Sequence, residues 1–184
     1  MLAFVALTLT ACLYIDACGT HGRAIHDMVA QDVMHADNGT FRTSDPATRQ
    51  ETAVAIAALF ELSPANSQAF PDIDGPAGVA ADSLAAEGVI QGFTDGTFRP
   101  DRHVTRGQLA TMLDRTVHLG EKRPQVPPPP FSDVQFDVGH GTSVAWLHAT
   151  GAVSGFPDGT FRQHAPVTRG QLATILHRKQ LDGS

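Results

Sequence analysis

One short motif occurs three times in this chain of 184 residues, and this repetition restricts the possible folds more than any other feature. The copies are 38–42 (NGTFR), 95–99 (DGTFR) and 158–162 (DGTFR). A Thr-Arg pair follows seven residues after each Phe, at Thr48-Arg49, Thr105-Arg106 and Thr168-Arg169. Repetition of this kind indicates units that bury their apolar faces against one another. The sequence therefore predicts one compact domain made of three copies of a single unit.

Each unit is predicted to end in a capped α-helix. Thr105 and Gln108 have the spacing of a capping box, and Val104 and Leu109 that of a hydrophobic staple. The same box spacing recurs at Thr168 and Gln171 and at Thr48 and Glu51. Apolar residues then follow at i, i+3 and i+4, which is typical of an amphipathic helix. Each unit is interpreted as helix, glycine-rich turn and capped helix, so the fold class is mainly α.

The beginning of each unit differs more between copies. The second and third open with Phe-x-Asp, ending at Asp72 and Asp133, and no such opening is evident in the first copy. We expect these boundaries: 1–21, an export or lipoprotein-like segment; 22–63, a degenerate first repeat; 64–120, the second repeat; 121–130, a proline-rich connector; 131–181, the third repeat.

The N-terminal twelve residues, MLAFVALTLTAC, resemble the apolar region of an export signal, although they lack its positive n-region. Residues 9–12 resemble a lipoprotein cleavage box, which makes Cys12 a candidate lipid anchor. The alternative is an ordinary apolar N-terminal segment. The stretch is too short to span a membrane, so no membrane span is expected.

Composition and motifs exclude several classes of function. The formal net charge of −6 argues against sequence-blind nucleic-acid binding, which needs clustered Lys and Arg. No metal site is expected, because the nine histidines are scattered and no cysteine lies after Cys18. No phosphate-binding loop or nucleophile motif occurs, so neither a cofactor nor a catalytic residue is predicted.

The arginine at the first helical position of each unit is the strongest candidate for function. A cation there opposes the helix dipole, yet Arg49, Arg106 and Arg169 all occupy it. One interpretation is an anionic ligand held by the guanidinium and by free N–H groups at the helix start. The other is an internal salt bridge, for example to Asp72 or Asp133. Residues alone leave both open.

The only tryptophan, Trp146, is a further candidate. A buried helix position is its default interpretation, and stacking on a sugar ring is the functional one.

The order Phe-x-Asp, helix, Gly-Phe-x-Asp-Gly-Thr-Phe-Arg and Val-Thr-Arg-Gly-Gln resembles the S-layer homology repeat of bacterial envelope proteins, most closely its actinobacterial members. The resemblance is strong over 70–115 and 131–178 and weaker over 25–60. It implies a pseudo-threefold bundle of helices on the cell surface that binds an acidic, often pyruvylated, secondary cell-wall polysaccharide.

The family's ligand-binding Arg corresponds directly to Arg106 and Arg169, and by position to Arg49. Its glycine-rich turn corresponds to Gly92 and Gly155, among others. We therefore expect a secreted, non-catalytic anchoring module whose ligand chemistry rests mainly on the last two repeats. The alternatives are an assembly module that contacts other envelope proteins and, less favoured, a cell-wall hydrolase.

Overall fold

The computed structural model describes Tyr14 and residues 16–181, and this part of the chain is built from α-helices. The helices are α1 (Gly22–Ala30), α2 (Arg49–Leu59), α3 (Gly75–Ala86), α4 (Arg106–Val117), α5 (Gly141–Ala149) and α6 (Arg169–Leu181). Within these residues, extended pairing is limited to isolated bridges between loops. The predicted mainly α fold is confirmed.

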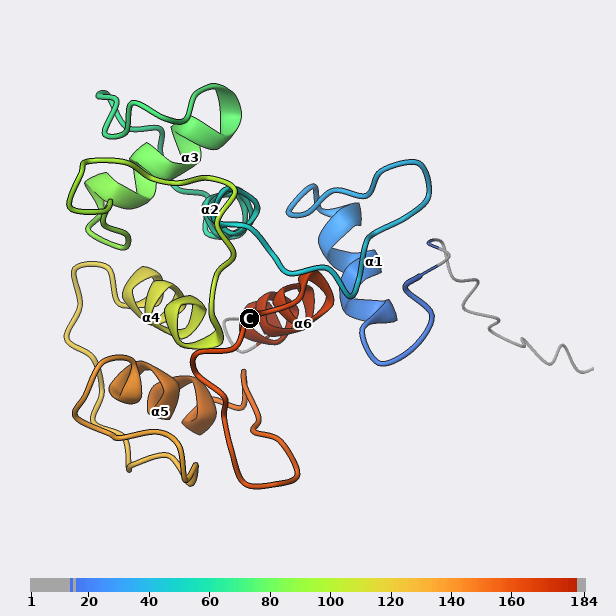
Figure 1. Ribbon diagram of the computed structural model, residues 1–184, viewed down its shortest axis with the longest axis vertical. Helices are drawn as coiled ribbons and strands as arrows, with labels where there is room; N and C mark the ends of the chain where they lie inside the picture. The colour runs from blue at the N-terminus through green and yellow to red at the C-terminus, as the bar shows by residue number, and fades with distance from the viewer. Residues whose placement is uncertain (1–13, 15, 182–184) are drawn as a thin grey trace, which may run out of the picture.

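The helices pack in three pairs, and each pair is shared between repeats (Figure 1). The second helix of the first repeat, α2, packs on α3, which is the first helix of the second repeat. In the same way α4 packs on α5, and α6 returns to pack on α1. Because each unit completes its neighbour's helix pair, the three repeats form a closed cycle, in agreement with the prediction that no unit buries its apolar faces alone.

Three backbone hydrogen bonds close this cycle at its centre. The N–H of Ala47 donates to the carbonyl of Val167, Val167 donates to Val104, and Val104 donates to Ala47, at 2.9, 2.9 and 3.0 Å. All three side chains are fully buried. These residues precede the N-caps of α2, α4 and α6, so the central ring sets the positions at which the second helices begin.

The predicted capping boxes are present at the starts of these helices. In α4, the Thr105 hydroxyl accepts from the N–H of Gln108, and the Gln108 side chain accepts from the N–H of Thr105. The same pair of bonds occurs in α2 and α6. The next repeat supplies carbonyls for the first two helical N–H groups: Arg106 donates to Ala165, and Gly107 to Gln163. The expectation of free N–H groups at the helix starts is therefore wrong.

The first repeat also has the opening that its sequence seemed to lack. The Asp16 carboxylate accepts from the N–H groups of Phe41 and Thr43, at 2.8 and 2.6 Å. Asp72 makes the equivalent pair of bonds to Phe98 and Arg99, and Asp133 to Phe161 and Arg162. Tyr14, whose ring centroid lies 6.5 Å from that of Phe41, replaces the opening Phe. The opening is Tyr-x-Asp, so the first repeat begins within the segment expected to be an export signal.

The apolar N-terminus and the candidate lipid anchor at Cys12 lie outside the described residues. Among the helices that the structure describes, none combines the length and the apolar character needed to cross a bilayer.

Candidate functional site

The three repeated arginines occupy equivalent places beside the turn of the next repeat. Arg106 donates from Nε to the carbonyl of Phe161 at 2.8 Å, and its guanidinium lies 4.4 Å from the centroid of that ring. Arg49 makes the same two contacts with Phe98, and Arg169 makes them with Phe41. Each arginine is therefore held by a carbonyl and an aromatic face, a cation–π geometry that stabilises a partly desolvated guanidinium.

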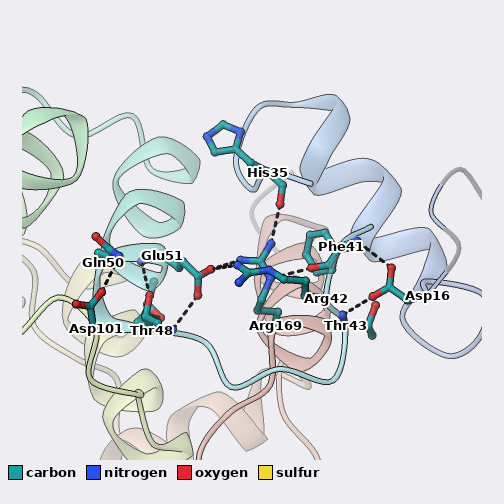
Figure 2. A network of polar contacts seen from close by, with 11 residues as sticks. Asp16, His35, Phe41, Arg42, Thr43, Thr48, Gln50, Glu51, Asp101 and Arg169 are labelled. Carbon is teal, nitrogen blue, oxygen red and sulfur yellow. Dashed lines mark hydrogen bonds and ion pairs between the residues drawn. The ribbon is translucent and has the colours of Figure 1, made fainter. Parts of the chain in front are cut away.

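The remaining donors of these arginines meet different partners. Arg169 forms an ion pair with Glu51 of the first repeat and also donates to the carbonyl of His35 at 2.6 Å (Figure 2). Arg106 donates from Nη2 to the carbonyl of Ser154 at 3.3 Å and, within the described part of the chain, forms no ion pair. Arg49 resembles Arg106, with Gln91 as its carbonyl partner. The internal salt bridge considered from the sequence is thus present in one repeat only, and its acid is Glu51 rather than Asp72 or Asp133.

A cavity of about 200 Å³, here called the α6 groove, lies beside Arg106. The turn of the third repeat contributes residues 152–156, α6 contributes Gln171, Thr174 and Arg178, and the segment before α1 contributes His21. The lining contains two arginines and no Asp or Glu. Arg178 makes no hydrogen bond or ion pair with the residues that the structure describes. The α6 groove is therefore a cationic cleft with polar groups on several sides.

A second cavity of about 290 Å³, the α2 groove, lies at the equivalent place beside Arg169. Two arginines, Arg42 and Arg169, also line it, but so do Asp37 and Glu51. The Glu51 carboxylate pairs with both guanidiniums, at 2.7 Å from Arg42 and 2.5 Å from Arg169. The formal charge of this lining is therefore balanced, and an anionic ligand would have to displace an existing carboxylate.

The corresponding face of α4 has the same residue types at the equivalent positions, although Arg115 also lines a cavity with Glu87, Asp114 and Glu121. Arg49 stands in the position of Arg106, Gln108 in that of Gln171, and Arg115 in that of Arg178. Arg49 and two further cations, Arg99 and Arg102, lie within 5.2 Å of the Phe93 ring centroid. Among the described residues, Arg49 and Arg106 thus have no paired carboxylate, and Arg169 is neutralised by Glu51.

Burial changes the titration of the groove residues. Burial and the charge of Arg162 lower the pKa of Arg106, whereas the charge of Asp133 acts in the opposite sense. Burial and the charge of Arg178 lower the pKa of His21. An arginine with a lowered pKa remains protonated at neutral pH, because its ordinary pKa lies far above 7. The groove therefore keeps its two positive charges, while the imidazole of His21 favours its neutral form.

Trp146 is only 4% exposed, which agrees with its default interpretation as a buried helix residue. It packs edge-on against His118, with ring centroids 4.7 Å apart, and Lys179 covers its face. These contacts leave little of the ring surface on which a sugar could stack.

The other predicted site residues have structural contacts. The Asp72 and Asp133 carboxylates accept turn N–H groups, as described above, and neither forms an ion pair with a repeated arginine among the described residues. A Cβ on Gly92 would lie 2.7 Å from the Phe70 ring, and one on Gly155 would lie 2.4 Å from the Phe131 ring. These glycines allow the opening aromatic ring to pack against the turn, and Gly155 also lines the α6 groove.

Four residues near these sites were not identified from the sequence: His21, His140, Thr174 and Arg178. A signal for the histidines was present, since His-Gly precedes the first helix at 21–22 and again at 140–141. The second repeat has Ala77-Gly78 there, so the pattern does not repeat in all units. Within the described residues, no group of three or more His, Cys, Asp or Glu side chains is placed to hold a metal ion.

Comparison with known proteins agrees with this architecture. Residues 80–110 and 130–173 match the model of the S-layer homology domain. Cell surface glycoprotein 1 of Acetivibrio thermocellus is 29% identical over 154 residues, which cover 77% of this chain and 7% of that protein. The Cellulosome-anchoring protein of the same organism is 29% identical over 153 residues, 76% of this chain and 33% of that protein. The Surface-layer 125 kDa protein of Lysinibacillus sphaericus is 32% identical over 123 residues, 67% of this chain and 10% of that protein.

All three relatives are longer, and the aligned region spans a third or less of their length. The similarity therefore concerns the repeat module that these proteins have in common with this chain.

Proposed function

Because this chain belongs to the S-layer homology family, we propose that it is a non-catalytic module that attaches to the bacterial cell wall by binding an anionic wall polysaccharide. It is a cell-envelope anchoring module located at the cell surface. The polysaccharide, its negative charge and the residues that bind it are the parts of the proposal that need testing.

The composition of the α6 groove carries the proposal. Arg106 and Arg178 line one cavity without any acidic side chain, and neither forms an ion pair with a described residue. Two guanidiniums in a concave, partly desolvated site favour a carboxylate or phosphate, because screening by water is reduced there. Gln171, Thr174 and Ser154 add neutral groups of the kind that bind sugar hydroxyls.

The structure changes which arginines are proposed to bind ligand. Arg106 remains in place, with Arg178 added from the same groove. Arg169 is paired with Glu51, which argues against its use for an anion. Arg49 is also free of an ion pair within the described part of the chain, and Arg99 and Arg102 share the Phe93 ring with it. The two proposed positions are therefore Arg106 and Arg49 rather than Arg106 and Arg169.

Cosedimentation with purified wall sacculi tests the proposal. Arg178→Gln is the informative variant, because Arg178 makes no described hydrogen bond or ion pair, so its loss should leave the fold intact. Lys122→Gln is the matched control, since it removes one exposed positive charge from the connector. We expect Arg178→Gln to weaken binding and Lys122→Gln to leave it unchanged. Equal binding by wild type and Arg178→Gln, with Arg106→Lys also unchanged, would refute the assignment of the groove.

Assembly with other envelope proteins is the other function considered from the sequence. The same experiment distinguishes it: binding to sacculi stripped of protein requires a wall polymer, whereas an assembly module would self-associate in light scattering and ignore such sacculi. Hydrolysis is checked in parallel, because release of reducing sugar from the sacculi would contradict the non-catalytic assignment.

A further inference from the structure

We propose that His21 and His140 are ligand contacts that make anion binding at the α6 groove and at the equivalent face of α4 stronger as the pH falls. This inference deepens the proposed function and rests on it. It concerns two residues that the repeat motif does not contain, and it assigns them a role in specificity.

The three repeats provide an internal comparison. His21, His140 and Ala77 occupy the same position in their helix pairs, because each directly precedes an equivalent glycine. Gly22 and Gly141 are the first residues of α1 and α5, and Gly78 lies within α3. The facing position holds Thr174, Thr111 and Val54, respectively. The histidine and the threonine thus occur together in two pairs and are replaced together in the third.

The replaced pair is the one beside the neutralised arginine. Ala77 and Val54 line the α2 groove, together with Glu51 and Asp37. Where the repeated arginine lacks a carboxylate, the His–Thr pair is present; where Glu51 balances the charge, it is absent. The histidines therefore occur beside the arginines that lack a carboxylate. They are not required for the fold, since the equivalent helix pair forms with Ala77 and Val54 in the same places.

The geometry of both histidines is the same. His21 Nδ1 lies 2.7 Å from Thr174 Oγ1, and His140 Nδ1 lies 2.8 Å from Thr111 Oγ1. Each ring packs directly on the second residue of a helix: a Cβ on Gly170 would lie 2.9 Å from the His21 ring, and one on Gly107 would lie 2.5 Å from the His140 ring. The equivalent residue of α2 is Gln50. Glycine is thus found where a histidine ring must fit.

The second ring nitrogen of His21 is available for a ligand. His21 lines the α6 groove, and its Nε2 has no hydrogen-bond partner among the described residues. A protonated imidazole donates from both nitrogens, so Nδ1 would donate to Thr174 and Nε2 to an anion in the groove. A threonine hydroxyl suits this arrangement, because it accepts as readily as it donates.

The charged groups that face these rings are cations. Arg178 on α6 and Arg106 across the groove face His21, and Arg115 on α4 and His164 face His140. Burial lowers the pKa of both imidazoles, with Arg178 acting in the same sense on His21, and His164 and Arg115 on His140, so their neutral forms are favoured at pH 7. An anion placed among these groups reverses the electrostatic effect and favours the protonated ring. By linkage, binding then takes up a proton and strengthens as the pH falls, by about tenfold per site for each unit by which ligand raises the pKa.

The test measures wall binding against pH. Cosedimentation with purified sacculi is carried out from pH 5 to pH 8 for wild type and for the double variant His21→Ala, His140→Ala. Alanine is chosen because Ala77 shows that the repeat accepts it. His26→Gln is the control, since His26 lies on α1 with its side chain half exposed and contacts Asp27. In parallel, NMR titration of the imidazole of His21 with and without solubilised wall fragments reports its pKa directly.

We expect wild type and His26→Gln to bind several-fold more tightly at pH 5.5 than at pH 7.5, and the double histidine variant to lose this dependence. Arg178→Gln should weaken binding and retain the dependence. If the double variant keeps the wild-type pH profile, or if the His21 pKa does not rise with wall fragments, the inference is wrong while the proposed function stands. If wild type fails to bind sacculi at any pH, the proposed function fails, and this inference fails with it.

Discussion

Glu51 and Arg169 are 118 residues apart in the sequence, yet Glu51 Oε1 lies 2.5 Å from Arg169 Nη1. The pair connects the first repeat to the third, at the junction where the helical cycle closes (Figure 2). Glu51 also caps α2 by accepting from the N–H of Thr48 at 2.9 Å. The repeat with the least typical sequence thus provides the ionic contact that joins the two ends of the fold.

Glu51→Gln is expected to destabilise the protein. Glutamine still accepts the N–H of Thr48, as Gln108 and Gln171 do in their helices, so the helix cap survives. The almost fully buried guanidinium of Arg169 loses its charged partner, and hydrogen bonds to charged groups are worth about 1.5–3 kcal/mol. We expect a comparable loss in the free energy of unfolding, measured by urea denaturation. Glu61→Gln, an exposed glutamate just beyond α2, should change it little.

The same pair predicts sensitivity to acid. Burial raises the pKa of the Glu51 carboxyl, but the N–H of Thr48 and the guanidinium of Arg169 outweigh it, so the pKa lies below its ordinary value. A carboxyl with a lowered pKa stabilises the fold above its unfolded-state pKa, and this stabilisation is lost as the pH falls through the folded-state pKa. Thermal unfolding followed between pH 3 and pH 7 should show a shallower decline for Glu51→Gln than for wild type. Parallel curves would contradict this account.

Asp16→Ala is expected to cost about as much stability as Asp72→Ala or Asp133→Ala. Each carboxylate accepts two turn N–H groups, and in the first repeat these belong to Phe41 and Thr43. Removing the carboxylate leaves two turn N–H groups without their charged acceptor, which lowers the free energy of unfolding. Chemical denaturation of the three variants checks this expectation, with the exposed Asp137→Asn as control. A negligible effect of Asp16→Ala alone would mean that the first repeat does not depend on its Tyr-x-Asp opening.

The local features of the repeat could be predicted because they depend on neighbours in sequence. The Thr105–Gln108 capping box is one example, since both residues lie within one helical turn. Other features of the first repeat were harder to predict, because a different residue stands where the other copies have Phe or Gly. Tyr14 replaces Phe in the first opening, and Asp32, with φ of 59°, occupies the left-handed position that Gly88 and Gly151 hold in the other copies. Asp tolerates this conformation better than most residues do.

The site was less predictable, because it depends on which repeats share a helix pair. The sequence identifies Arg169 and Glu51 as parts of separate capping motifs and cannot show that they meet. The α6 groove likewise combines Arg106 from the second repeat, Arg178 from the third and His21 from the segment before α1. The sharing of helix pairs between repeats is a property of the closed cycle, so the site follows only from the three-dimensional arrangement.

The central ring predicts that the three repeats unfold together. The amides of Ala47, Val104 and Val167 each donate to a carbonyl of a different repeat, and opening one of these bonds breaks the cycle that holds the other two. Their hydrogen exchange should therefore require global unfolding, with the same free energy at all three amides and equal to that from urea denaturation. The amide of Gln31, at the C-terminal end of α1, bonds within its own helix and should exchange through smaller openings. Hydrogen exchange measured by NMR checks this, and faster exchange at Ala47 than at the two valines would show that the first repeat opens separately.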